Sequence, residues 1–155
     1  MKANSPTHDL TSDTAATLVR RFEGCRLAAY QDGRGIWTIG WGHSGPDVTM
    51  GGEWTQAQAD TQLAADLLTA EDALARLVTV PLAEGQAGAL VSMIFNLGPN
   101  ALAGSKLILS VNARDWIDAA HQMIRWDHQD GAESTGLLIR RLAEATAFLE
   151  SSSKE

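Results

Sequence analysis

The sequence lacks a second cysteine: Cys25 is the only one among 155 residues, so no disulfide can form within the chain. Bases are also scarce, because 12 lysines and arginines oppose 19 aspartates and glutamates and leave a net charge of −7. An acidic balance argues against nucleic acid and anionic membranes as partners. No apolar run reaches the roughly 18 residues that a membrane-spanning helix needs. The polar first ten residues also predict neither a signal peptide nor a membrane anchor.

The length predicts one domain, with enough residues to bury a core without disulfides. Most of the negative charge lies between residues 47 and 84, where seven acids oppose the single base Arg76. We expect a flexible N-terminus over residues 1–12, one domain over 13–150, and a disordered tail over 151–155.

Apolar periodicity and turn residues divide the domain into a small strand-containing part and a larger helical part. Helices are predicted over 13–23, 55–78, 81–97, 105–111, 115–126 and 137–149, and short strands over 27–31 and 35–41. Asp32-Gly33 between the two strands is a hairpin signal. The helix over 55–78 opens with a capping box at Thr55 and is long enough to join two lobes. We therefore expect an α+β fold, with a β-hairpin lobe over about 24–54 and a helical lobe over about 55–150.

Two carboxylates and one hydroxyl flank this hairpin: Glu23, Asp32 and Thr38. A carboxylic acid can protonate the leaving oxygen of a glycosidic bond, while a second carboxylate and a hydroxyl hold and activate water. Each residue also has an ordinary explanation. Glu23 could pair with a neighbouring arginine, Asp32 could simply begin a turn, and Thr38 could reflect strand propensity. Their spacing favours the chemical interpretation.

The spacing also resembles a family. Glu23, then Asp32, then the string Thr38-Ile39-Gly40-Trp41-Gly42-His43 resembles the motif of the phage-type lysozymes, glycoside hydrolase family 24. Two later segments, Phe95-Asn96-Leu97-Gly98 and the run from Gly136 to Glu144, resemble further motifs of that family, in the same order. The resemblance implies a lysozyme-like α+β fold in which a long helix joins the two lobes.

The resemblance also implies roles for individual residues. Glu23 would be the general acid, Asp32 the carboxylate on the side of the water, and Thr38 a residue that holds that water. The residues expected to line the sugar-binding cleft are Ser44, Phe95, Ser105 and Gln122. We further expect a structural ion pair between His43 and Asp66, which would tie the β lobe to the long helix. No metal site and no organic cofactor are expected.

The implied activity is hydrolysis of the β-1,4 bond between N-acetylmuramic acid and N-acetylglucosamine in peptidoglycan, with inversion at the anomeric carbon. The implied biological role is that of a phage endolysin in host cell lysis. We expect a monomer made in the host cytoplasm without a signal peptide. A separate holin would release it to act on the cell wall in the periplasm.

Two other functions remain open from the residues. A lytic transglycosylase would use Glu23 alone, and a catalytically inactive peptidoglycan-binding protein would use none of the three residues. Two interpretations of Arg140 and Arg141 also remain open: they form a solvated helix face, or they lie near the cleft and orient carboxylates or substrate.

Overall fold

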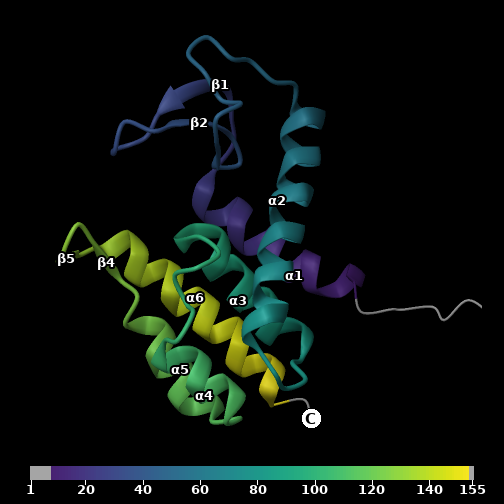
Figure 1. The fold of residues 1–155 in the computed structure, drawn as a ribbon, viewed down its shortest axis with the longest axis vertical. Helices are drawn as coiled ribbons and strands as arrows, with labels where there is room; N and C mark the ends of the chain where they lie inside the picture. Colours follow the sequence, from purple (N-terminus) through teal and green to yellow (C-terminus); the bar gives the residue numbers. More distant parts are fainter. Residues whose placement is uncertain (1–7, 154–155) are drawn as a thin grey trace, which may run out of the picture.

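The computed structural model describes residues 8–153, which form a small β lobe above a larger helical lobe (Figure 1). The helices are α1 (His8–Glu23), α2 (Gln56–Leu77), α3 (Glu84–Leu97), α4 (Lys106–Asn112), α5 (Trp116–Ile124) and α6 (Thr135–Ser152). The strands are β1 (Arg26–Gln31), β2 (Trp37–Gly40), β3 (His43–Ser44), β4 (His128–Gln129) and β5 (Ala132–Glu133). The expected α+β architecture is confirmed.

The β lobe follows directly from the end of α1. Its three strands are antiparallel in the order β1-β2-β3, and Thr38 of β2 pairs with Tyr30 on one side and with Ser44 on the other. Paired residues of neighbouring strands project to the same face of a sheet. The three hydroxyl-bearing residues therefore form one row across the sheet.

Helix α2 joins the lobes, running from the β lobe down the side of the helical lobe (Figure 1). Its predicted capping box is present: Thr55 accepts a hydrogen bond from the backbone N–H of Gln58, and the Gln58 side chain accepts one from the Thr55 backbone. The apolar stripe that includes Leu63, Leu67 and Leu74 is buried. Within residues 8–153, no helix combines the length and apolar character needed to cross a membrane.

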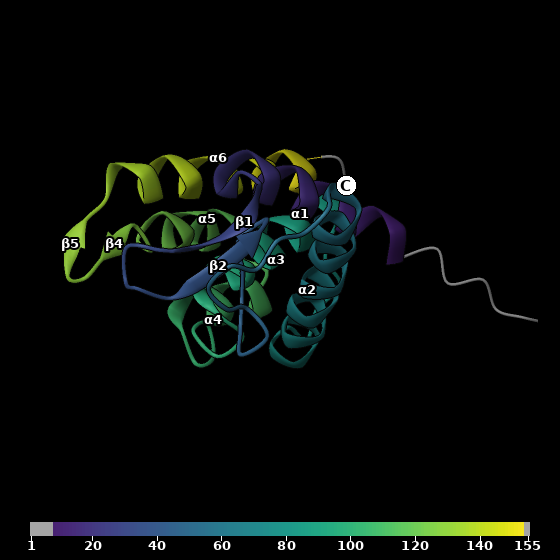
Figure 2. The same ribbon diagram turned by 90° about the horizontal axis from the view of Figure 1, so that it is seen from above.

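Helix α3 is the centre of the core. It packs against α1, α2 and α6. In Figure 2, which looks from above, α3 is drawn lower in the picture than α1 and α6. Its large buried apolar residues are Leu90, Val91, Met93 and Ile94. Each buried side chain of this size contributes about 1.5–3 kcal/mol. Close approach of α1 requires glycine at position 88, because a Cβ there would lie 2.6 Å from Thr14.

Both ends of the described chain differ from the prediction. Helix α1 begins at His8 rather than near Ser12, so part of the segment predicted as flexible is helical, while residues 1–7 lie outside the described residues. At the other end, α6 continues to Ser152, so the prediction of a disordered tail from residue 151 was wrong at its start. The reason is a tertiary contact: the hydroxyl of Ser151 accepts a hydrogen bond of 2.9 Å from Gly85.

One further local prediction was wrong, and one element was missed. Helix α3 begins at Glu84 and not at Pro81, because Ala83 is the N-cap and its backbone N–H is bound by the Gln86 side chain at 2.9 Å. The β4–β5 hairpin was not predicted. Its turn, Asp130-Gly131, has positive φ at both residues and carries the same Asp-Gly signal as the first hairpin.

Candidate active site

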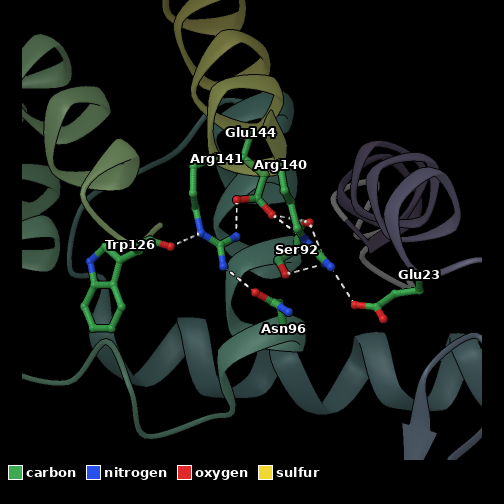
Figure 3. Close-up of polar contacts among 7 residues, drawn as sticks. All are labelled: Glu23, Ser92, Asn96, Trp126, Arg140, Arg141 and Glu144. Carbon is green, nitrogen blue, oxygen red and sulfur yellow. Dashed lines mark hydrogen bonds and ion pairs between the residues drawn. The ribbon is translucent and has the colours of Figure 1, made fainter. Parts of the chain in front are cut away.

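Glu23 is the last residue of α1, where Gly24 (φ +66°) ends the helix. Its carboxylate oxygen Oε1 accepts a hydrogen bond of 2.5 Å from Nη1 of Arg140 on α6, and about a quarter of its side chain (23%) stays exposed. Figure 3 shows the two side chains reaching toward each other from separate helices. Glu23 is thus paired with a residue of the closing helix and not with a neighbouring arginine.

The other carboxylate oxygen of Glu23 lies against Gly42. A Cβ at position 42 would lie 2.9 Å from Oε2, and Gly42 has a φ of +86° that side chains rarely adopt. Glycine is therefore required here for two reasons, the backbone conformation and the space that the carboxylate occupies. The two oxygens of Glu23 consequently have different surroundings: Oε1 faces Arg140 and Oε2 faces the backbone of the TIGWGH string.

Asp32 lies in the loop between β1 and β2 and is held by its own loop. Its Oδ1 accepts hydrogen bonds from the backbone N–H of Arg34 (2.8 Å) and of Ile36 (2.9 Å). The bond from Ile36, followed by the bond from Arg34, lowers the pKa of the Asp32 carboxyl below its usual range. Asp32 is therefore ionised at neutral pH and fixed in direction, as a carboxylate that activates water requires.

Thr38 is buried in the row of hydroxyl-bearing residues on the sheet, and its Oγ1 donates to the carbonyl of Ile36 at 3.1 Å. The next residue in that row is Tyr30, which pairs with Thr38. Burial raises the pKa of its phenol, and the negative charges of Glu23 and Asp32 raise it further against the opposing effect of Arg26.

A hollow of about 240 Å³ lies between the β lobe, α2 and the end of α3. It is lined by Gly42, His43, Ser44, Asp66, Thr69, Ala70, Ile94, Phe95, Gly98 and Pro99. Two of the residues predicted to contact sugar, Ser44 and Phe95, therefore meet in one cavity although they belong to different lobes. Gly42 connects this cavity to Glu23.

The other two residues predicted to contact sugar do not line this hollow. Ser105 is the N-cap of α4, where its hydroxyl accepts from the backbone N–H of Ile108 at 3.3 Å. Gln122 lies on α5 and donates to Asp118 at 3.3 Å. Both side chains have local structural partners, so their contact with sugar stays a prediction.

His43 and Asp66 are brought together as the sequence suggested, with 2.8 Å between Nδ1 of His43 and Oδ2 of Asp66. Asp47 approaches the other ring nitrogen of His43, Nε2, at 3.1 Å. The bond between His43 and Asp66 thereby ties the segment Gly42–Ser44 to α2 at the wall of the hollow. Within residues 8–153, no cluster of three or more histidine, cysteine, aspartate or glutamate side chains could hold a metal ion.

Arg140 and Arg141 are both buried, so the interpretation as a solvated helix face was wrong for this pair. Arg140 orients a carboxylate, as the second interpretation had it. Sequence reasoning gave no place in the site to Tyr30, which pairs with Thr38 across β1 and β2. The available signal was its position on the strand opposite Thr38, which an antiparallel register across the Asp32 turn would have given.

Comparison with known proteins gives one consistent result. The sequence model described as Phage lysozyme matches residues 20–144. The endolysin of Salmonella phage P22 is 40% identical over 142 residues, which cover 89% of this chain and 97% of the relative. The endolysin of Escherichia coli O157:H7 phage FAHEc1 superposes with a TM-score of 0.82 at 32% identity, covering 97% of this chain and 98% of that one. The muramidase domain of SpmX from Asticaccaulis excentricus gives a TM-score of 0.80 at 33% identity, covering 94% of this chain and 99% of that one.

Proposed function

Because this chain belongs to the phage lysozyme family, we propose that it hydrolyses the β-1,4 bond between N-acetylmuramic acid and N-acetylglucosamine. The coarser function, that of an endolysin of the lysozyme type which degrades peptidoglycan, follows from the family itself. The single observation that carries the finer proposal is the different treatment of the two carboxylates. Glu23 is partly buried and has one oxygen bound by Arg140, whereas Asp32 is held ionised by backbone N–H groups.

Glu23 is the general acid of the proposed reaction. Arg140 occupies Oε1, which leaves Oε2, beside Gly42, as the oxygen that carries the proton to the leaving glycosidic oxygen. A neutral carboxylic acid can still accept the Arg140 hydrogen bond through its carbonyl oxygen, so pairing and proton donation are compatible. The proton leaves Glu23 as the C–O bond breaks, and Arg140 then faces a full negative charge. The pair therefore gains strength as the reaction proceeds.

Asp32 and Thr38 act on the side of the water. The ionised Asp32 accepts a proton from the attacking water, and the Thr38 hydroxyl, which donates its own hydrogen to the Ile36 carbonyl, can accept the other hydrogen of that water. Attack by water instead of by a carboxylate gives inversion at the anomeric carbon. Ser44 and Phe95 are the proposed contacts to the sugar rings, supported by their shared position in the hollow beside Gly42.

The biological setting is part of the same proposal. The enzyme acts as a monomer on glycan strands, reaches the wall in the periplasm after synthesis in the host cytoplasm, and depends on a separate holin for release. The endolysin name of the phage P22 relative supports the role in host lysis. Its test is lysis of a host that expresses the chain: we expect lysis when the cytoplasmic membrane is permeabilised and none before.

The proposed chemistry is tested by Glu23→Gln, which keeps the shape of the side chain and an acceptor for Arg140 but removes the acid. Clearing of permeabilised cells should slow about 10²–10⁴-fold, the range for loss of a general acid. Glu53→Gln changes an exposed glutamate of the same lobe and should clear cells at the wild-type rate. Equal rates for wild type and Glu23→Gln contradict the proposal. Mass spectrometry of the released fragments completes the test, since 1,6-anhydro ends would indicate a transglycosylase.

A further inference from the structure

Another carboxylate, that of Glu144 on α6, lies on the other side of Arg140 from Glu23 (Figure 3). Its side chain is fully buried, and its carboxylate is bound by the side chains of Ser92, Arg140 and Arg141. Oε1 accepts from the Ser92 hydroxyl at 2.7 Å and from Nε of Arg140 at 3.1 Å, while Oε2 accepts from Nη1 of Arg141 at 2.6 Å. A carboxylate that is removed from water needs such partners on both oxygens.

These contacts determine the direction of the Arg140 guanidinium. The group is planar and rigid, so fixing the Nε–H direction toward Glu144 also fixes where Nη1 and Nη2 point. Nη2 lies 3.4 Å from the carbonyl of Ser92, on the central helix α3. Nη1 is thereby directed at Oε1 of Glu23. The orientation is set from α3 and α6, which belong to the helical lobe, before any contribution from Glu23.

Arg141 anchors the far side of the same carboxylate. Its Nε donates to the carbonyl of Trp126 at 2.9 Å, and its Nη2 donates to the side chain of Asn96. In Figure 3, Arg141 reaches to one side and Arg140 to the other, with Glu144 between them. Glu144 therefore cannot move without breaking its bonds to Ser92 of α3 and to Arg141, which is itself held by Trp126. Its fixed position determines the orientation of the Arg140 guanidinium.

We propose that Glu144 is a positioning residue for the general acid: through Nε of Arg140 it holds the guanidinium that binds Oε1 of Glu23 and so selects Oε2 as the proton-bearing oxygen. This inference rests on the proposed function of Glu23. Glu144 touches neither substrate nor the reacting atoms, and its effect passes through Arg140. Loss of the correct orientation of the Arg140 guanidinium should lower kcat, because Glu23 then delivers the proton from the wrong place. It should leave KM nearly unchanged.

The test uses Glu144→Asp, which keeps the negative charge between the two arginines but withdraws the carboxylate by one methylene group. We expect kcat on soluble glycan strands to fall about 10–100-fold with KM unchanged within about twofold, since a misplacement near 1 Å can cost 10²-fold. The ¹³C resonance of the Glu23 carboxyl, assigned from its absence in Glu23→Gln, should shift as well.

Ser151→Ala is the matched control. It also removes a hydrogen bond between α6 and α3, the one from the backbone N–H of Gly85, but at a position seven residues further along α6 than Glu144. It should lower the unfolding midpoint and leave kcat and the Glu23 resonance as in wild type. Ser92→Ala provides a milder second variant, because it removes one donor to Glu144 Oε1 without removing a charge. We expect about a threefold lower kcat and a resonance shift of the same sign.

Wild-type kcat and an unshifted resonance in folded Glu144→Asp overturn the positioning role. If Glu144→Asp does not fold, Ser92→Ala decides by the same two readouts. A loss of kcat in Ser151→Ala equal to that in Glu144→Asp also overturns it, since the effect would then be a general loosening of the packing between α3 and α6. These outcomes are separate from failure of the proposed function, which appears as full activity in Glu23→Gln.

Discussion

Glu23 and Asp32 differ in the origin of the groups that hold them. Asp32 is bound by the backbone of residues two and four positions further along, inside one loop. Glu23 is bound by Arg140, which lies 117 positions away, and Arg140 is in turn held by α3 and α6. The water side of the site is thus built by local sequence, whereas the acid side exists only once the helical lobe has folded. Stability and activity should therefore be coupled at Glu23 and separable at Asp32.

The largest effect is expected from Arg140→Ala. This change leaves the buried Glu144 and the partly buried Glu23 without a shared cation, and breaking a buried pair in this way costs about 3–5 kcal/mol of unfolding free energy. Urea unfolding measures it. Arg34→Ala removes the ion-pair partner of Asp32. Because the Arg34 side chain is 66% exposed, this change should leave the unfolding midpoint unchanged. Similar midpoints for the two variants would remove the contrast between the acid side and the water side.

Asp32→Asn should separate the structural role of this residue in the loop from its role in hydrolysis. The amide oxygen can accept the same two backbone N–H groups, so the loop persists, while hydrolysis slows about 10²–10⁴-fold because the base is lost. Thermal unfolding at neutral pH and turnover of soluble glycan strands measure the two effects on one sample. A large fall in thermal stability at neutral pH would mean that the charge, and not the turn, holds the loop.

The same variant has a defined pH dependence. The pKa of Asp32 is lowered in the folded protein, so its ionised form stabilises the fold above the unfolded-state pKa of about 3.9. This contribution is lost as the pH falls through the folded-state pKa. The small stability advantage of the wild type over Asp32→Asn should be present at pH 7, shrink below about pH 4 and vanish in stronger acid. An advantage that grows toward acid contradicts the assignment.

Gly42→Ala should reduce activity about 10–100-fold, because the new methyl group displaces the Glu23 carboxyl. Gly51→Ala is matched to it: Gly51 also has positive φ, at +81°, but a Cβ there meets nothing within 4 Å. Both variants carry the same backbone strain, about 1–2 kcal/mol, so the difference in activity between them isolates the contact with Glu23. Equal activity in the two variants would mean that the contact is unimportant.

The smallest contrast concerns the two carboxylates beside His43. Asp66 is 23% exposed and also accepts from Gln62, whereas Asp47 is 58% exposed. Asp66→Asn should lower unfolding free energy by about 1 kcal/mol, the usual value of a hydrogen bond that is partly shielded. Asp47→Asn should cost less than about 0.5 kcal/mol. The reverse order, measured by denaturant unfolding, would show that the loop and not α2 fixes His43.

The division between local and distant contacts also explains what the sequence could predict. The Thr55 capping box, the hairpin at Asp32 and the apolar stripe of α2 depend on neighbouring residues, and the structure has all three. Helix α6 outlasts its predicted end because Ser151 binds Gly85, a contact between residues far apart in sequence. The direction in which Glu23 points depends on Arg140 in the same way, which no pattern around residue 23 reveals.

The motif resemblance identified candidate site residues, but only the folded structure shows which of them lie close together. Ser44 and Phe95 were predicted singly, and only the packing of the β lobe over α2 and α3 places them in one hollow. Ser105 and Gln122 were predicted on the same grounds but lie outside that hollow, since α4 and α5 turn them toward local partners. Tertiary packing, and not residue type, decides which side chains share a cavity.

The most direct test of the account is the anomeric configuration of the first product, followed by ¹H NMR during hydrolysis of a soluble glycan strand. If Glu23 delivers the proton while Asp32 and Thr38 deliver water from the opposite face, the new reducing end appears first as the α anomer. Initial formation of the β anomer, or of a 1,6-anhydro sugar, would contradict this division of labour between the two carboxylates.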